Sequence, residues 1–212
     1  MFGHLFKKNA APHAEPDLVP ASSYLIAQLN ARLQPMHRGE LFEDPLDDAL
    51  QQLGVGSVTG GGTQMSDSGE VAHCDIEIKV AALDEHTVHT VISCLERLGA
   101  PIGSQLRLEV GAEAEGEEKE RKLPFGVTEG MAIYLNGTDL PDEVYARERS
   151  DAVYSELERL IDGGGEIYSH WQGPTETALY LYGNSFKDMH ERVAGFLASH
   201  PLCQKCRIEQ IA

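Results

Sequence analysis

The chain has 212 residues, of which 34 are acidic and 17 are basic, and its formal net charge at pH 7 is −17. This charge argues against a nucleic-acid partner, because affinity for a phosphate backbone depends on Lys and Arg side chains that release counterions. No apolar run reaches the roughly 18 residues that span a bilayer, so no membrane partner is expected. The four cysteines, with no secretory leader before them, indicate free thiols in a reducing, cytoplasmic environment.

The beginning of the chain lacks any apolar period. Pro12, Pro16 and Pro20 stand there among alanine, histidine and acidic residues, a composition typical of an extended segment. We therefore expect residues 1–21 to form a flexible lead-in and residues 22–110 to form a first folded unit.

The first folded unit opens with a predicted strand and a predicted helix. Apolar and polar residues alternate over residues 25–33, which is the period of a strand buried on one face. Asp44 and Pro45 then predict the start of a helix, with Asp44 as N-cap and proline at the first helical position. Leucines repeat on one face of this helix until Gly54, which predicts its end.

Two further strands and a second helix complete the first unit. Residues 56–65 predict a strand whose triple glycine indicates a bulge or a close backbone approach. Residues 71–80 show the clearest alternation in the chain. A helix is predicted from Asp84, and it ends before a last strand at residues 105–110.

The second half of the chain repeats this order after a charged segment. Residues 111–129 are polar and begin with GAEAEGEEKERK, which predicts an acidic linker or a solvated hairpin extension. Residues 130–212 form the second predicted unit. Its predicted strands lie at residues 131–136, 166–172, 177–182 and 205–211, and its predicted helices at residues 140–161, capped from Thr138 or Asp139, and at 186–199.

The two units are related by duplication. Residues 100–109 and 200–209 share a proline at the second position, the same apolar pattern and a final Arg-x-Glu, and the glycine runs at 60–62 and 163–165 are a further match. The predicted fold is α+β, a tandem duplication of a ferredoxin-like βαββαβ unit, with two antiparallel sheets that each carry two helices on one face.

The open faces of the two predicted sheets differ in chemistry. The first is polar and the second is aromatic, and an aromatic sheet of this topology resembles an RNA-binding surface without the basic residues around it. Three interpretations remain open: the two sheets pack on each other, the chain forms a homodimer, or an outside partner binds. The predicted interface residues are Asn30, His73, Asp75 and Glu77 in the first unit and Tyr134, Tyr168, His170, Tyr180 and Tyr182 in the second.

Two other groups carry residues capable of chemistry. The segment before the first helix suggests a loop site made of His37, Arg38, Glu40 and Glu43. The capping of the helix explains the adjacent acidic residues, so we predict no metal there. Cys203 and Cys206 have metal-like spacing, but four ligands are needed, and the duplication places Cys206 at an inward strand position.

No catalytic residues and no cofactor are predicted. We expect a bacterial-type, non-catalytic acidic protein-interaction module, such as a regulator, an inhibitor or an immunity-type protein, which binds a protein partner or itself as a homodimer. One alternative is a small-ligand-binding regulatory protein with its site between the repeats. Another is a metal-dependent enzyme that uses His37, Glu40, Glu43 and Asp44.

Overall fold

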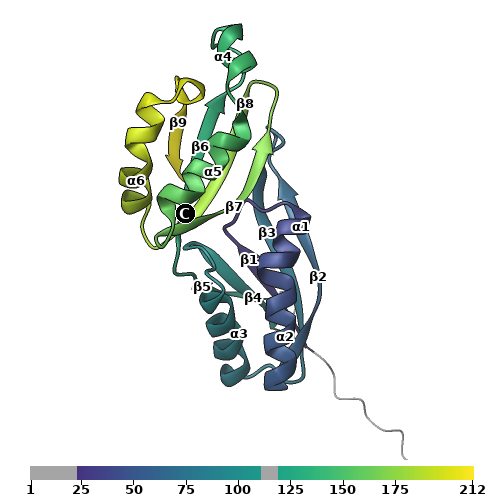
Figure 1. Cartoon of the computed structure of the whole chain (residues 1–212). Coiled ribbons are helices and arrows are strands. Elements are labelled where there is room, and N and C mark those ends of the chain that lie inside the picture. The colour runs from purple at the N-terminus through teal and green to yellow at the C-terminus, as the bar shows by residue number, and fades with distance from the viewer. Residues whose placement is uncertain (1–22, 111–118) are drawn as a thin grey trace, which may run out of the picture.

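The computed structural model describes residues 23–110 and 119–212, so the predicted lead-in at residues 1–21 lies outside the described residues. It contains two α+β units, each built on an antiparallel sheet with helices on one face (Figure 1). Both units have the ferredoxin-like order of strands and helices, which confirms the predicted fold class. No helix in the described ranges combines the length and the apolar character needed to cross a bilayer.

The first unit has a five-stranded sheet in the order β2-β3-β1-β4-β5. Helices α2 and α3 cover one face of this sheet (Figure 1). The strands are β1 (Ser23–Leu29), β2 (Gly56–Met65), β3 (Val71–Val80), β4 (Ser104–Val110) and β5 (Lys119–Phe125), and the helices are α2 (Asp44–Leu53) and α3 (Glu85–Arg97).

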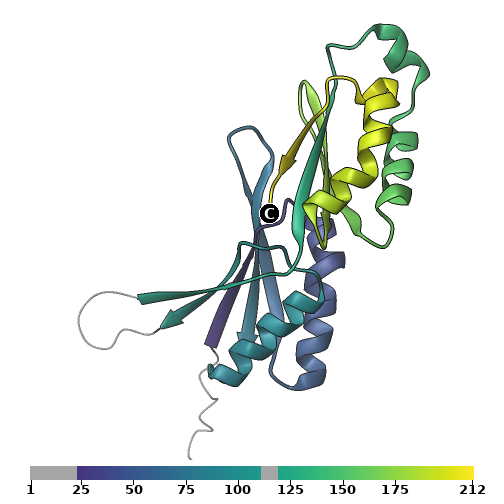
Figure 2. The same ribbon diagram turned by 90° about the vertical axis from the view of Figure 1, so that its left-hand side faces the viewer.

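The predicted acidic linker contributes a strand to the first sheet. Strand β5 pairs with β4 from Val110↔Lys119 to Ser104↔Phe125, and the two strands form a ribbon that projects from the body of the unit (Figure 2). Residues 111–118 of the predicted linker lie outside the described residues. The described remainder is not a simple connector, since residues 119–125 form an edge strand and Glu129 already belongs to the second sheet.

The first helix begins ten residues before its predicted start. Helix α1 (Pro35–Arg38) runs through a π-helical turn, η1 (Gly39–Glu43), directly into α2. Asp44 has helical angles, φ −63° and ψ −51°, so the prediction that it is an N-cap is wrong. Pro35 starts the helix instead, because its fixed φ suits a first helical position.

The first strand ends earlier than its alternating pattern suggests. Strand β1 stops at Leu29, although Ala31 and Leu33 remain fully buried. The N–H of Asn30 donates to the side-chain Oγ of Ser104 at 3.0 Å, and the pairing of β1 with β4 ends at Gln28↔Gln105. The alternation therefore reports burial correctly but overstates the length of the ladder.

The second unit has a four-stranded sheet in the order β7-β8-β6-β9. Helices α5 and α6 pack against one face of it (Figure 1). The strands are β6 (Glu129–Asn136), β7 (Gly165–Gln172), β8 (Glu176–Gly183) and β9 (Arg207–Gln210), and the helices are α4 (Asp142–Arg147), α5 (Ser150–Ile161), α6 (Phe186–Ser199) and the 3₁₀ turn η2 (Pro201–Cys203).

The predicted helix over residues 140–161 is two helices. The chain is extended at Glu148 and Arg149, between α4 and α5, and the residue before α4 is Pro141, which provides no side-chain cap. The last strand is also shorter than predicted, because Lys205 has φ +61° and cannot lie in a strand.

The glycine runs at 60–62 and 163–165 are not equivalent positions. Gly54 caps α2 with φ +68°, and Gly163, with φ +73°, lies one residue beyond the cap of α5; Gly56 and Gly165 begin the strands that follow. Strand β2 has a register shift between Val58 and Gly60, which agrees with the predicted bulge. The helix ends therefore define the alignment of the two units better than the triple glycines do.

The two hydrophobic cores are unequal. The core of the second unit lies between its sheet and its helices and contains only residues of that unit. The core of the first unit also includes Ala132, Tyr134, Ala178, Tyr180 and Tyr182, which lie on the far face of the second sheet. The first core therefore extends across the junction between the units.

Candidate functional site

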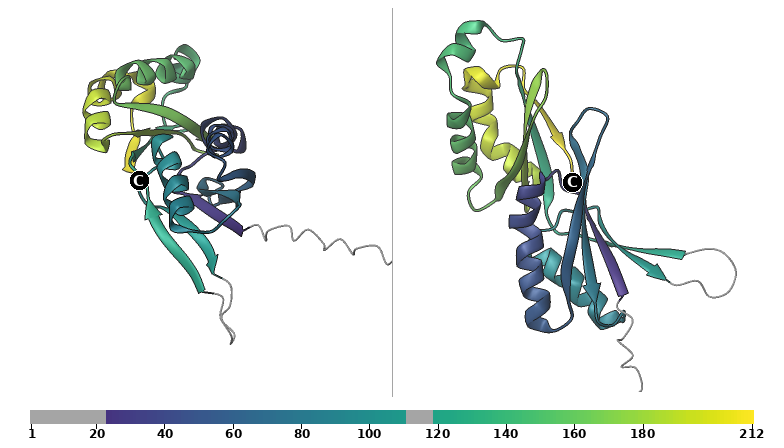
Figure 3. Two further views of the ribbon diagram at one scale, coloured as in Figure 1. Left: turned by 90° about the horizontal axis from the view of Figure 1, so that it is seen from below. Right: turned by 90° about the vertical axis from the view of Figure 1, so that its right-hand side faces the viewer.

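The aromatic face of the second sheet is buried inside the molecule. Tyr134, Tyr180 and Tyr182 are each 1% exposed. The segment after β1 and the hairpin between β2 and β3 lie against this face (Figure 3). The two sheets are not stacked face to face, because the open side of the first sheet still exposes Glu77 and Lys79 to solvent.

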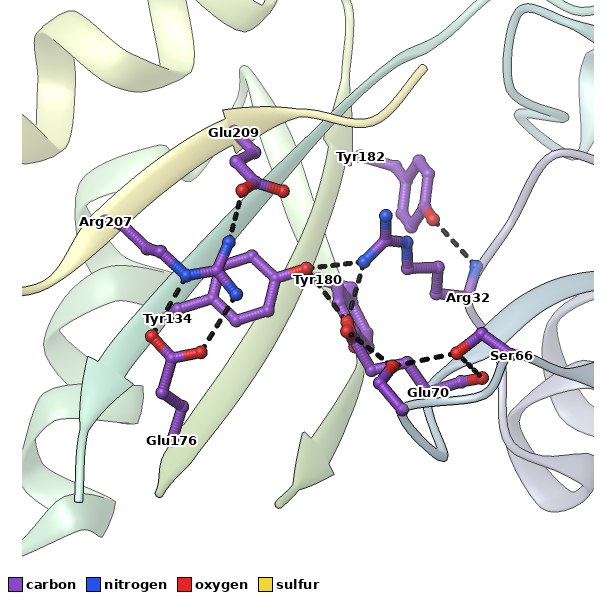
Figure 4. Close-up of polar contacts among 10 residues, drawn as sticks. Arg32, Ser66, Glu70, Tyr134, Glu176, Tyr180, Tyr182, Arg207 and Glu209 are labelled. Atoms are coloured by element: carbon purple, nitrogen blue, oxygen red, sulfur yellow. Dashed lines mark hydrogen bonds and ion pairs between the residues drawn. The ribbon is translucent and has the colours of Figure 1, made fainter. Parts of the chain in front are cut away.

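A charged pair from the first unit meets the tyrosine hydroxyls of the second (Figure 4). Arg32 Nη1 lies 2.7 Å from Glu70 Oε1. The hydroxyls of Tyr134 and Tyr180 both donate to the same oxygen of Glu70, at 2.8 and 2.7 Å. The hydroxyl of Tyr182 accepts the backbone N–H of Arg32 at 2.9 Å. All of these polar groups are therefore satisfied at the junction.

The junction perturbs the acid–base properties of its members. Burial alone would raise the pKa of Glu70, but the hydrogen bonds from Tyr180 and Tyr134 and the charge of Arg32 lower it. Burial raises the pKa of Tyr180, Tyr182 and Tyr134. At neutral pH the cluster therefore holds an ionised carboxylate surrounded by protonated phenols.

A second ionic group extends the junction over the outer strand of the second sheet (Figure 4). The Arg207 guanidinium lies 3.3 Å from the centre of the Tyr134 ring. It forms two hydrogen bonds of 2.9 Å with Glu176 and also pairs with Glu209. Arg207 thus covers the part of Tyr134 that the first unit leaves open.

The remaining predicted aromatic residues line the side of the junction. Tyr168 stacks on Tyr182 with ring centres 4.9 Å apart, and its edge meets Phe42 at 6.1 Å. Burial raises the pKa of Tyr168 to about 12. Asn30, which we expected on the open face, instead donates to the carbonyls of Ile102 and Ile211 and joins the two units.

The predicted loop site is part of a helix, and its residues are divided between two tasks. Arg38 is buried and donates to Glu43 Oε1 at 2.7 Å and to Thr63 Oγ1 at 2.5 Å. Only the absence of a side chain at Gly61 permits this contact, since a Cβ there would lie 2.0 Å from Glu43 Oε1. Arg38 and Glu43 therefore attach the helix to the first sheet.

His37 and Glu40 point toward the second unit. His37 Nδ1 lies 3.0 Å from Ser169 Oγ, and its ring centre is 6.1 Å from that of His170. These residues border a pocket of about 190 Å³ between the units, which Tyr154, Glu166 and Tyr168 also line. Two of the predicted loop residues, His37 and Glu40, thus meet the predicted interface residue His170 at one edge of the junction.

The geometry does not support the metal-dependent alternative. Within the described ranges, no group of three or more His, Cys, Asp or Glu side chains is placed to hold a metal ion. Glu43 is engaged with Arg38, so His37, Glu40, Glu43 and Asp44 do not form a ligand set. Cys203 is buried and Cys206 half-buried against the second core.

The open face of the first sheet has no cover from the second unit. Asp75 accepts hydrogen bonds from Gln28 at 3.3 Å and Arg107 at 3.2 Å. Glu77 and Lys79 are exposed, and His73 is half-buried. In the middle of the face, β1 presents Tyr24, which is 50% exposed, and the half-buried Ile26.

Sequence reasoning missed Tyr24 and Ile26 at the centre of this face. Extending the alternation one residue backward from Leu25 places Tyr24 on the open side of the strand, and Ile26 is an apolar residue at an outward position within the alternating range, between the buried Leu25 and Ala27. It also missed Glu70, which stands in a polar turn and carries no periodic signal.

No family model matches the chain, and no curated protein matches it. Among solved structures, it is similar to the first two RRM domains of a yeast poly(U) binding protein, with 10% identity, a TM-score of 0.23 and coverage of 89% of this chain and 99% of that one. It is also similar to the regulatory subunit of aspartate kinase from Thermus flavus, with 12% identity, a TM-score of 0.25 and coverage of 82% and 94%. Scores this low carry no argument about function.

Proposed function

We propose that the chain is a non-catalytic protein-interaction module and that its partner binds the open face of the first sheet. The observation that supports this most is the contrast between the two sheets. The second unit's open face is covered within the chain, whereas the equivalent face of the first unit presents Tyr24 and Ile26 to solvent. Large apolar side chains on a central strand are usually covered in the functional state.

The composition of this face resembles that of a protein interface. Its centre is apolar, and a rim of charged and polar side chains surrounds it. Such a core and rim is typical of protein–protein contacts. The rim consists of Asp75, Glu77, Lys79, Arg107 and Lys122.

The edges of the sheets are less suitable for binding than the face. The edge strand β2 has bulges, β7 has a register shift between Ile167 and Ser169, and β9 has four residues. The edge strand β5 contains four charged residues and Pro124. These features oppose strand addition, so a partner is expected on the face.

The burial of the junction argues against a nucleic-acid partner. The tyrosines that would stack on nucleic-acid bases are buried between the units, so we propose a protein partner and no nucleic acid. The four cysteines are unpaired, which fits a reducing compartment such as the cytoplasm.

A photo-crosslinking experiment tests the site. A photoreactive phenylalanine analogue at Tyr24 should capture a specific protein in the source cells, and Ile26→Asp should abolish that product by placing a charge at the centre of the contact. The same analogue at Glu85, on the exposed helix side, is the control and should capture nothing specific. Equal products from both positions, or none from Tyr24, would overturn the proposal.

The pocket between the units supports a second candidate, a regulatory protein that binds a small ligand there. Its two carboxylates, two imidazoles and two phenols converge from both units on about 190 Å³. A ligand that binds only the folded state raises the melting temperature. A screen of amino acids and small amines should give such a rise in the wild type and not in Tyr154→Ala, and a flat response throughout the screen would end this candidate.

A further inference from the structure

We propose that the partner on the open face of the first sheet is a second copy of the same chain, an inference that rests on the proposed function. The face has the charge distribution of a self-complementary surface. Residues at one level of the sheet run from acidic on β3, through apolar on β1, to basic on β4 and β5. They are Glu77, Ile26, Arg107 and Lys122, which lie side by side in the strand register.

Symmetry converts this row into pairs of opposite charge. In the sheet, β1 lies between β3 and β4. When two such faces stack about 10 Å apart, a twofold axis along β1 places β3 of each copy over β4 of the other. Glu77 of one copy then faces Arg107 of the second copy, and the reverse contact follows from the symmetry.

The apolar residues lie where the axis requires them. Ile26 pairs with both Glu77 and Arg107 across its neighbouring strands, so it stands at the middle of the row and meets Ile26 of the second copy. Tyr24 lies on the same side of the same strand and is 50% exposed. An isologous contact thus covers both residues and leaves the charges on the rim, as in stable interfaces.

The row is acidic at one end and basic at the other, and this distribution of charge also distinguishes a second copy from other partners. A partner of uniform charge would leave either Glu77 or the basic side facing a like charge. A second copy satisfies both sides with one arrangement. The strong net charge of −17 opposes association in general, so the dimer is expected to tighten as salt screens the long-range repulsion.

Charge exchange tests this arrangement directly. By analytical ultracentrifugation, the wild type should be a dimer of the 23.2 kDa chain. Glu77→Lys and Arg107→Glu should each weaken the dimer about tenfold or more, because each reversal acts twice in a symmetric interface. The double variant should recover most of the affinity. Glu85→Lys, a charge reversal on the exposed helix side, is the control and should remain dimeric.

A crosslink on the axis provides a second test that does not depend on charge. With Ile26→Cys, a short bismaleimide should join two chains, since each Ile26 faces its symmetry mate. Glu85→Cys on the exposed helix side should not crosslink. Circular dichroism and thermal unfolding show whether each variant is folded before it is interpreted.

The outcomes separate this inference from the proposed function. A wild type that stays monomeric at every concentration and salt level overturns the dimer. If Tyr24 then still captures a different protein, the proposed binding face stands without the symmetry. A dimer that ignores Glu77→Lys, Arg107→Glu and Ile26→Asp overturns the arrangement on this face.

Discussion

The two open sheet faces of this chain occupy equivalent places in duplicated units, yet one is a buried interior and the other is a surface. The second face carries Tyr134, Tyr180 and Tyr182 and is covered by the first unit. The first face carries Asp75, Glu77 and Lys79 in the matching rows and is solvated. Duplication thus preserves the backbone while the side chains decide which copy is covered.

The test with the largest expected effect on stability removes one tyrosine from each face. Tyr182→Ala should lower the free energy of unfolding by about 3–5 kcal/mol, because it opens a cavity in the junction. Tyr24→Ala, on the uncovered face, should change it by about 0.5 kcal/mol or less in the monomer. Urea unfolding measures both. Similar losses from the two variants would show that the faces do not differ in burial.

The next test removes the carboxylate of Glu70, which several side chains of the junction share as their hydrogen-bond acceptor. Glu70→Ala should cost about 2–3 kcal/mol, since Arg32 and the Tyr134 and Tyr180 hydroxyls lose their common partner. The matched control is Tyr180→Phe, which removes one hydroxyl and should cost about 1 kcal/mol. A Glu70→Ala loss no larger than the control would contradict the central role of this carboxylate.

A test with a smaller expected effect on stability compares the two sides of the first sheet itself. Gly61→Ala places a methyl group 2.0 Å from Glu43 Oε1, on the side covered by the helices, and should cost about 1–3 kcal/mol. Gly62→Ala directs its methyl group to the open side, 4.0 Å from Asp75 Cβ, and should be tolerated. Thermal unfolding in parallel distinguishes them, and equal effects would argue against the close approach.

The smallest effect is a dependence on acidity. The pKa of Glu70 is lowered in the folded state, so its contribution to stability is complete above the ordinary value of 4.5 and is lost as pH falls through the lowered pKa. The stability difference between wild type and Glu70→Gln should therefore shrink below that pH. A difference that grows on acidification would show that Glu70 is not stabilised as a carboxylate.

Strong periodicity predicted much of the fold from the sequence. The helix at residues 186–199 and the strand at 71–80 were predicted with their observed bounds, and Asp84 caps α3 by accepting the Thr87 N–H. The start at Pro35 was not predicted, because Gln34 provides no side-chain cap. Strand β5 was not predicted either, since KERKLPF is an edge strand without alternation.

The candidate site was predictable only in part. The alternating pattern identifies Tyr134, Tyr180 and Tyr182 as one face, but it contains no information about what covers them. Of the covering residues, Arg32 belongs to the alternation of residues 25–33 and Glu70 lies in a polar turn outside any alternation, and both are far from the tyrosines in sequence. Contacts of this kind arise from tertiary packing, which a local pattern cannot report.

The unequal division of the two cores has a consequence for the order in which the protein matures. The first unit leaves the ribosome before the second, yet its core includes tyrosines and alanines that the second unit supplies. The second core needs no residue from the first. Synthesis therefore proceeds from the less complete unit to the more complete one, and the emerging first half keeps an unfinished apolar end until the later half has folded against it.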